Sequence, residues 1–142
     1  GPMGVFTLKE DAKEVMLLGG GIGITPFRDM IKYATDKKLA IKVTLLYSNR
    51  STADICYKDE WPIFEKQNQN LKVVNTITDN TSGWTGRTGR INEAMIKEFC
   101  SDINNTLFYI CGPPAMVTGL SELLKTMNIP MQNIKIEKFA GY

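Results

Sequence analysis

The segment Leu18-Gly19-Gly20-Gly21-Ile22-Gly23-Ile24-Thr25-Pro26 has four glycines in five positions, between an apolar run and a segment of helical period. Glycine lets backbone N–H groups approach a ligand closely, and a helix start adds partial positive charge. We therefore expect a phosphate-binding turn in which Thr25 also caps the helix. Its contact residues would be Gly20, Gly21, Ile22, Gly23, Thr25 and Pro26. The segment matches neither G-x-G-x-x-G nor Walker A, so a tight turn that needs positive φ remains the alternative.

Apolar runs rich in β-branched residues alternate with helical segments along the rest of the chain. This alternation predicts an α/β fold, a three-layer Rossmann-like parallel sheet of about five strands with helices on both faces. The expected strands are Val15–Leu18, Val43–Tyr47, Val73–Ile77, Leu107–Cys111 and Ile134–Ile136. The expected helices start at Pro26, cover about Ala53–Gln67 with a break at Pro62, follow a cap at Asn92, and run from Pro114 to Met127.

A second turn of small residues, Cys111-Gly112-Pro113-Pro114-Ala115-Met116, follows the fourth expected strand. In open parallel sheets, ligands bind beyond the carboxyl ends of the strands, where the strand order reverses. If the first and fourth strands are neighbours, both turns line one crevice. A single cysteine on an apolar strand is more often core than chemistry, and here a contact role is favoured over a thiolate nucleophile.

The composition excludes several classes of function. The 142 residues include no histidine, which rules out Ser-His-Asp and Cys-His catalysis and histidine-zinc sites. Three cysteines without a C-x-x-C pair argue against a disulfide framework, an iron-sulfur cluster or a four-cysteine metal site, and favour a reducing, cytoplasmic setting. We expect no metal site. The net charge of +2 comes from intermixed signs, which argues against nucleic-acid binding, and no apolar run is long enough for a membrane span.

Several segments in register resemble the pyridine-nucleotide domain of the ferredoxin-NADP reductase superfamily, particularly oxygenase reductases and cytochrome reductases. They are GGGIGITP at 19–26, YSNRS at 47–51, GWTGRTG at 83–89, CGPPAM at 111–116 and EKF at 137–139. Residues 1–8 resemble the end of the flavin domain that precedes this domain in the family, while the flavin-binding R-x-Y-S/T motif has no counterpart. The resemblance implies that residues 9–142 form the pyridine-nucleotide-binding domain.

The resemblance implies an NAD(P)H-dependent flavoprotein reductase. Hydride would pass from NADH, preferred over NADPH, to FAD or FMN on the N-terminal domain, and electrons would continue to an iron-sulfur or haem protein. Thr25 would lie where nicotinamide and flavin meet, and Cys111 would lie close to the reactive nicotinamide carbon. Further cofactor contacts would come from Ser48, Gly112, Pro113 and Met116. Phe139 would shield the flavin, although Ala140-Gly141-Tyr142 extends beyond it, so that the alternatives are Tyr142 or neither residue.

The choice of nucleotide depends on two residues. Arg50 could pair with a 2′-phosphate or remain an ordinary solvated arginine. Asp79 resembles the acid that accepts a hydrogen bond from the ribose 2′-hydroxyl in NADH-dependent members, or it could simply be a turn residue. Trp84 and Tyr57 could flank the adenine or serve packing, and Arg87 could reach a phosphate or stay solvated.

Two other functions use the same fold. A module that senses nucleotide without turnover would need the same loops but not the residues that face a flavin. A flavodoxin-like domain that binds FMN would share the sheet.

Overall fold

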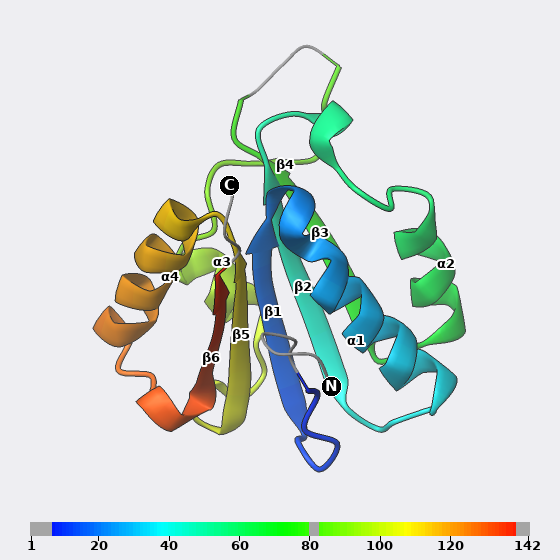
Figure 1. Cartoon of the computed structure of the whole chain (residues 1–142), viewed down its shortest axis with the longest axis vertical. Coiled ribbons are helices and arrows are strands. Elements are labelled where there is room, and N and C mark those ends of the chain that lie inside the picture. Colours follow the sequence, from blue (N-terminus) through cyan, green and yellow to red (C-terminus); the bar gives the residue numbers. More distant parts are fainter. Residues whose placement is uncertain (1–6, 80–82, 139–142) are drawn as a thin grey trace.

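The computed structural model describes residues 7–79 and 83–138, and it contains one sheet with helices on both faces (Figure 1). The strands are β1 (Glu14–Gly20), β2 (Lys42–Asn49), β3 (Leu71–Ile77), β4 (Arg87–Thr88), β5 (Thr106–Gly112) and β6 (Ile134–Lys138). Their order is β4-β3-β2-β1-β5-β6, and all neighbouring strands are parallel. The predicted fold class is confirmed.

The sheet has six strands rather than about five. The additional strand, β4, has two residues and pairs with the end of β3 through Thr76↔Arg87 and Ile77↔Thr88. Two residues are too few to show the alternating pattern by which a strand is found in a sequence. The five expected strands are all present, with ends that differ by at most two residues from the expected ones.

The helices form two outer layers. They are α1 (Thr25–Asp36), α2 (Glu60–Gln67), α3 (Glu93–Phe99) and α4 (Pro114–Thr126). Successive residues of β1 point to opposite faces, so Val15 and Leu17 pack with α1 and α2, whereas Met16 and Leu18 pack with α3 and α4. The central strand is therefore buried on both sides, as its continuous apolar sequence requires.

The second expected helix differs from the prediction in its start and in the role of its proline. The chain forms a short 3₁₀ turn at Thr52–Asp54, and α2 begins only at Glu60. Pro62 lies in the first turn of α2, where backbone N–H groups have no partner within the helix, so it does not break the helix. The Asn92 cap is confirmed, because its Oδ1 accepts the Met95 N–H at 2.9 Å. Among the described helices, none is long and apolar enough to cross a membrane.

Candidate functional site

The two small-residue turns meet at one point on the carboxyl edge of the sheet. The strand order reverses there, because β1 pairs with β2 on one side and with β5 on the other. Gly19 is paired with Cys111 across the β1–β5 ladder, and the Cys111 thiol donates a hydrogen bond to the Gly23 carbonyl at 2.8 Å. The structure thus brings together the two walls of the expected crevice.

The glycines of the first turn have different tasks. Gly19 and Gly20 continue strand β1 instead of forming the turn. A Cβ on Gly20 would lie 2.4 Å from Met116 Cε and 2.7 Å from the Ser48 carbonyl oxygen, and one on Gly112 would lie 3.1 Å from Met116 Sδ. Glycine at these positions allows the two walls to pack closely. The true turn residue is Gly21, whose φ of 70° lies in the left-handed region.

Two residues of β2 that the sequence analysis missed hold Gly21 in place. Asn49 Oδ1 accepts the Gly21 N–H at 3.2 Å, and the Tyr47 hydroxyl donates to the Gly21 carbonyl at 2.8 Å. Burial raises the pKa of Tyr47, which keeps the hydroxyl protonated as a donor. The signal available in the sequence was a tyrosine and an asparagine at the end of an apolar strand, inside the YSNRS segment.

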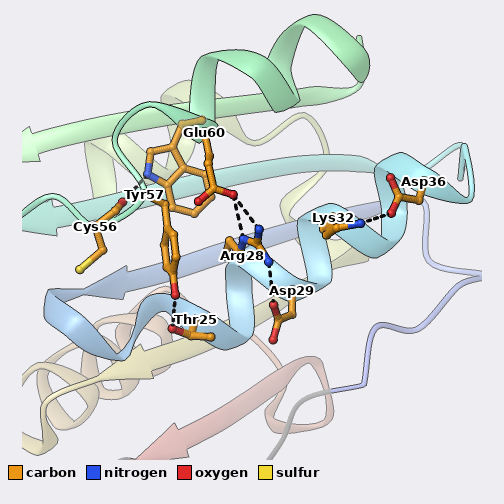
Figure 2. A network of polar contacts seen from close by, with 9 residues as sticks. Thr25, Arg28, Asp29, Lys32, Asp36, Cys56, Tyr57 and Glu60 are labelled. Atoms are coloured by element: carbon orange, nitrogen blue, oxygen red, sulfur yellow. Dashed lines mark hydrogen bonds and ion pairs between the residues drawn. The ribbon is translucent and has the colours of Figure 1, made fainter.

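Thr25 does not cap α1, contrary to the prediction. It is the first residue of the helix, and no side-chain cap hydrogen bond is made there. Its Oγ1 instead lies 2.7 Å from the hydroxyl oxygen of Tyr57, which comes from the loop before α2 (Figure 2). Tyr57 therefore lies at the start of α1, a position that the sequence analysis did not consider. A partner 32 residues away cannot be read from local capping patterns.

The Cys111 side chain is fully buried. Burial raises the pKa of its thiol to about 12, and the negative charge of Glu137 acts in the same direction. At neutral pH the thiol is therefore protonated, as its hydrogen bond to Gly23 requires. This environment suits a residue that packs against a ligand and does not suit a thiolate nucleophile.

The two residues expected to choose the nucleotide lie at the ends of neighbouring strands. The Asp79 N–H donates to the Arg50 carbonyl at 2.9 Å, and both residues are exposed. Both side chains can therefore meet a ligand beyond β2 and β3.

The residues of the GWTGRTG loop contact one another and helix α3. Trp84 Nε1 donates to the Arg87 carbonyl at 2.8 Å, and a Cβ on Gly86 would lie 2.4 Å from the Trp84 ring. The Arg87 guanidinium pairs with Glu98 at 2.6 Å and lies 5.2 Å from the Phe99 ring centroid. These contacts favour the packing role for Trp84, and they hold the Arg87 side chain against α3.

The remaining expected residues include two that the structure describes and two that it does not. Pro113 precedes α4 in the second turn, and Ile22 in the glycine turn is 75% exposed. Phe139 and Tyr142 lie outside the described residues. Within the described part of the chain, no group of three or more cysteine, aspartate and glutamate side chains could hold a metal ion.

The family described as "Oxidoreductase NAD-binding domain" matches residues 17–122. The chain is 29% identical over 151 residues to a component of the Na(+)-translocating NADH-quinone reductase of Pseudoalteromonas atlantica, and the match covers 99% of the chain and 36% of that protein. The Yersinia pestis counterpart is also 29% identical, with the same coverage. The chain thus spans about a third of the length of these relatives.

Two solved structures share the fold. An Amycolatopsis cytochrome P450 reductase is 25% identical with a TM-score of 0.84, over 98% of this chain and 42% of that one. The cytochrome b5 reductase domain of Ulva prolifera nitrate reductase is 26% identical with a TM-score of 0.79, over 90% of this chain and 50% of that one.

Proposed function

Since this chain belongs to the oxidoreductase NAD-binding domain family, we propose that it binds NADH across the carboxyl edge of its sheet and delivers hydride to a flavin on a preceding domain. A bound FAD or FMN would accept two electrons as hydride from nicotinamide C4 and release them singly to an iron-sulfur or haem protein. The residues of this chain would bind and align the nicotinamide and exclude water from it.

The observation that carries the proposal is the junction of the two turns, where the Cys111 thiol bonds the Gly23 carbonyl at 2.8 Å. Thr25 begins the helix that follows one turn, and Gly112 ends the strand that leads into the other. Hydride transfer between cofactors needs alignment rather than a protein acid or base. The neutral buried thiol of Cys111, the hydroxyl of Thr25 and the backbone of the two turns can provide this alignment. The chain's lack of histidine agrees with a reaction that needs no protein acid or base.

The surroundings of the turn support a flavin partner domain. Ile22 exposes 75% of its surface beside the crevice, and an apolar side chain in that position would be covered by a docked domain. The relatives and neighbours named above are NADH-quinone, cytochrome P450 and cytochrome b5 reductases, each longer than this chain. Leu8 is buried in the core cluster that includes residues of α1 and α2, whereas residues 1–6 of the segment that resembles the end of a flavin domain lie outside the described residues.

We also place the protein in a reducing compartment, the cytoplasm. Cys56, Cys100 and Cys111 are all free thiols. Proteins that mature in oxidising compartments more often pair their cysteines.

Asp79 is the residue that would select NADH. Its carboxylate would accept a hydrogen bond from the ribose 2′-hydroxyl and repel a 2′-phosphate. We expect the chain to bind NADH at least about tenfold more tightly than NADPH, a difference of ~1.4 kcal/mol. Asp79→Thr should remove that preference by weakening NADH and strengthening NADPH binding, as measured by titration with both nucleotides.

Asp11→Thr is the matched control, since Asp11 is exposed before the opposite end of β1. Its preference should equal that of the unmodified chain. Equal affinity of the unmodified chain for both nucleotides would contradict the assignment of Asp79, and no affinity for either would contradict the proposed function.

A further inference from the structure

The hydroxyl pair of Thr25 and Tyr57 joins the start of α1 to the loop before α2. Their oxygens are 2.7 Å apart, the usual separation for a hydrogen bond between two hydroxyls. Tyr57 has a φ of 56°, in the left-handed region that bulky side chains rarely adopt. Strained backbone of this kind persists where the surrounding contacts enforce it, often at functional sites.

The ring of Tyr57 is held from two sides. The Arg28 guanidinium carbon lies 5.5 Å from its centroid, and the Trp61 ring meets it edge-on at 6.0 Å and 85°. Arg28 is itself fixed, because its Nη2 and Nε donate to Glu60 Oε1 at 2.7 and 3.1 Å (Figure 2). The hydrogen bonds to Glu60 and its negative charge also raise the pKa of Arg28.

The backbone before Tyr57 is anchored as well. The Cys56 N–H donates to the Tyr47 hydroxyl at 3.1 Å, and the Cys56 carbonyl accepts from Trp61 Nε1 at 2.8 Å. Tyr47 is the residue that also holds the Gly21 carbonyl. One buried tyrosine thus connects the glycine turn with the segment that presents Tyr57, so the two are fixed relative to each other.

We propose that Tyr57 is a positioning residue for hydride transfer, which it serves by fixing the Thr25 hydroxyl at the nicotinamide end of the crevice. This inference rests on the proposed function. Threonine χ1 has three staggered states, and the bond to Tyr57 selects among them. Because either hydroxyl can donate, the pair still offers a hydrogen and lone pairs to a bound nicotinamide.

The test uses the whole flavoprotein and measures flavin reduction by NADH in anaerobic stopped flow. In this step the C4–H bond of the dihydronicotinamide breaks, and its electron pair forms the N5–H bond of the flavin. Tyr57→Phe keeps the ring and removes the hydroxyl. We expect the rate at saturating NADH to fall about 3- to 10-fold, the range for loss of one neutral hydrogen bond, with the dissociation constant for NADH changed less than about twofold.

A double-mutant cycle separates positioning from general destabilisation. In a Thr25→Val background, Tyr57→Phe should have no further effect on the rate, because its partner is already gone. Independent, multiplicative effects of the two substitutions would overturn the proposal, and so would an unchanged rate in Tyr57→Phe alone. Rescue of the rate in Thr25→Ser, relative to Thr25→Val, would support it.

Tyr33→Phe is the matched control. Tyr33 lies on α1, and its hydroxyl donates to Glu10 at 2.9 Å on the exposed side of the helix. Loss of this hydroxyl should leave the rate unchanged, and a loss equal to that of Tyr57→Phe would contradict a specific role for Tyr57. If the unmodified flavoprotein is not reduced by NADH at all, the proposed function fails. If it is reduced and Tyr57→Phe matches it, this inference alone fails.

Discussion

The Cys111 thiol is fully buried, donates to the Gly23 carbonyl at 2.8 Å and has a pKa raised to about 12. Below the pKa of an unfolded cysteine, about 8.5, both the folded and the unfolded chain keep this proton. Above it the unfolded chain loses the proton while the folded chain retains it. The linkage relation then makes the free energy of unfolding fall as the pH rises from about 8.5 towards 12.

We therefore predict that Cys111→Ala flattens the alkaline side of the stability profile. Urea unfolding at pH 7 and pH 10 should show a smaller loss of unfolding free energy in the variant than in the unmodified chain. Tyr47 and Tyr109 also have raised pKa values, but they are present in both proteins and cancel in the comparison. Parallel profiles would show that the thiol does not carry this effect.

Some residues of the candidate site could be predicted from the sequence and others could not. It predicts that Cys111 serves as a contact residue, because that conclusion needs only the strand and the absence of histidine. It misses Tyr47, Asn49 and Tyr57, because their partners are the Gly21 backbone and the Thr25 hydroxyl, far away in the chain. Hydrogen bonds between distant segments leave no periodic signal along a sequence.

At the scale of elements, Gly20 leaves room for Met116 of α4 and for the backbone of β2 at Ser48. Gly20→Ala would place a methyl group 2.7 Å from the Ser48 carbonyl and 2.4 Å from the Met116 side chain. Met116 can move, but the strand backbone resists. We predict a loss of about 1–3 kcal/mol in the free energy of unfolding, with weaker NADH binding in the same variant.

Gly119→Ala tests the same substitution where space is free. A Cβ on this exposed residue of α4 would meet nothing within 4 Å. Alanine has a higher helix propensity than glycine, so the free energy of unfolding should rise by about 0.5–1 kcal/mol. Equal effects at positions 20 and 119 would contradict the packing account of the glycine turn.

The elements themselves were predicted where a periodic pattern extends over a full strand or helix. The prediction ended β1 at Leu18 because it treated the glycines as turn residues, yet Gly19 and Gly20 pair with Tyr47 and Ser48 of β2. It also began the second helix several residues early. Tertiary packing decides both boundaries, and glycine or proline alone does not.

At the scale of the whole molecule, we propose that this chain binds NADH and that a separate flavin domain accepts the electrons. The chain alone should bind NADH yet oxidise it close to the background rate with ferricyanide as acceptor, because hydride needs a flavin placed by another domain. Addition of the flavin domain should raise the rate. Rapid NADH oxidation by the chain without added flavin would contradict this division of labour.

The resemblance to the ferredoxin-NADP reductase superfamily, predicted from short motifs in register, is confirmed by the matched family and the solved structures. Three of the motifs, GGGIGITP, YSNRS and CGPPAM, lie at the ends of β1, β2 and β5, and the parallel sheet brings those ends together at one edge. Strand order itself was not predicted beyond the suggestion that the first and fourth strands are neighbours, which is confirmed.

The pairing of β1 with β5 joins Glu14 to Thr106, and this has a consequence for synthesis of the protein. A chain still growing on the ribosome has the glycine turn long before it has the opposite wall of the crevice. Parallel pairings between distant segments also form slowly. Nucleotide binding should therefore arise only after β5 and the turn that follows it, residues 106–116, have been made, and NADH present at that stage would stabilise the β1–β5 pairing.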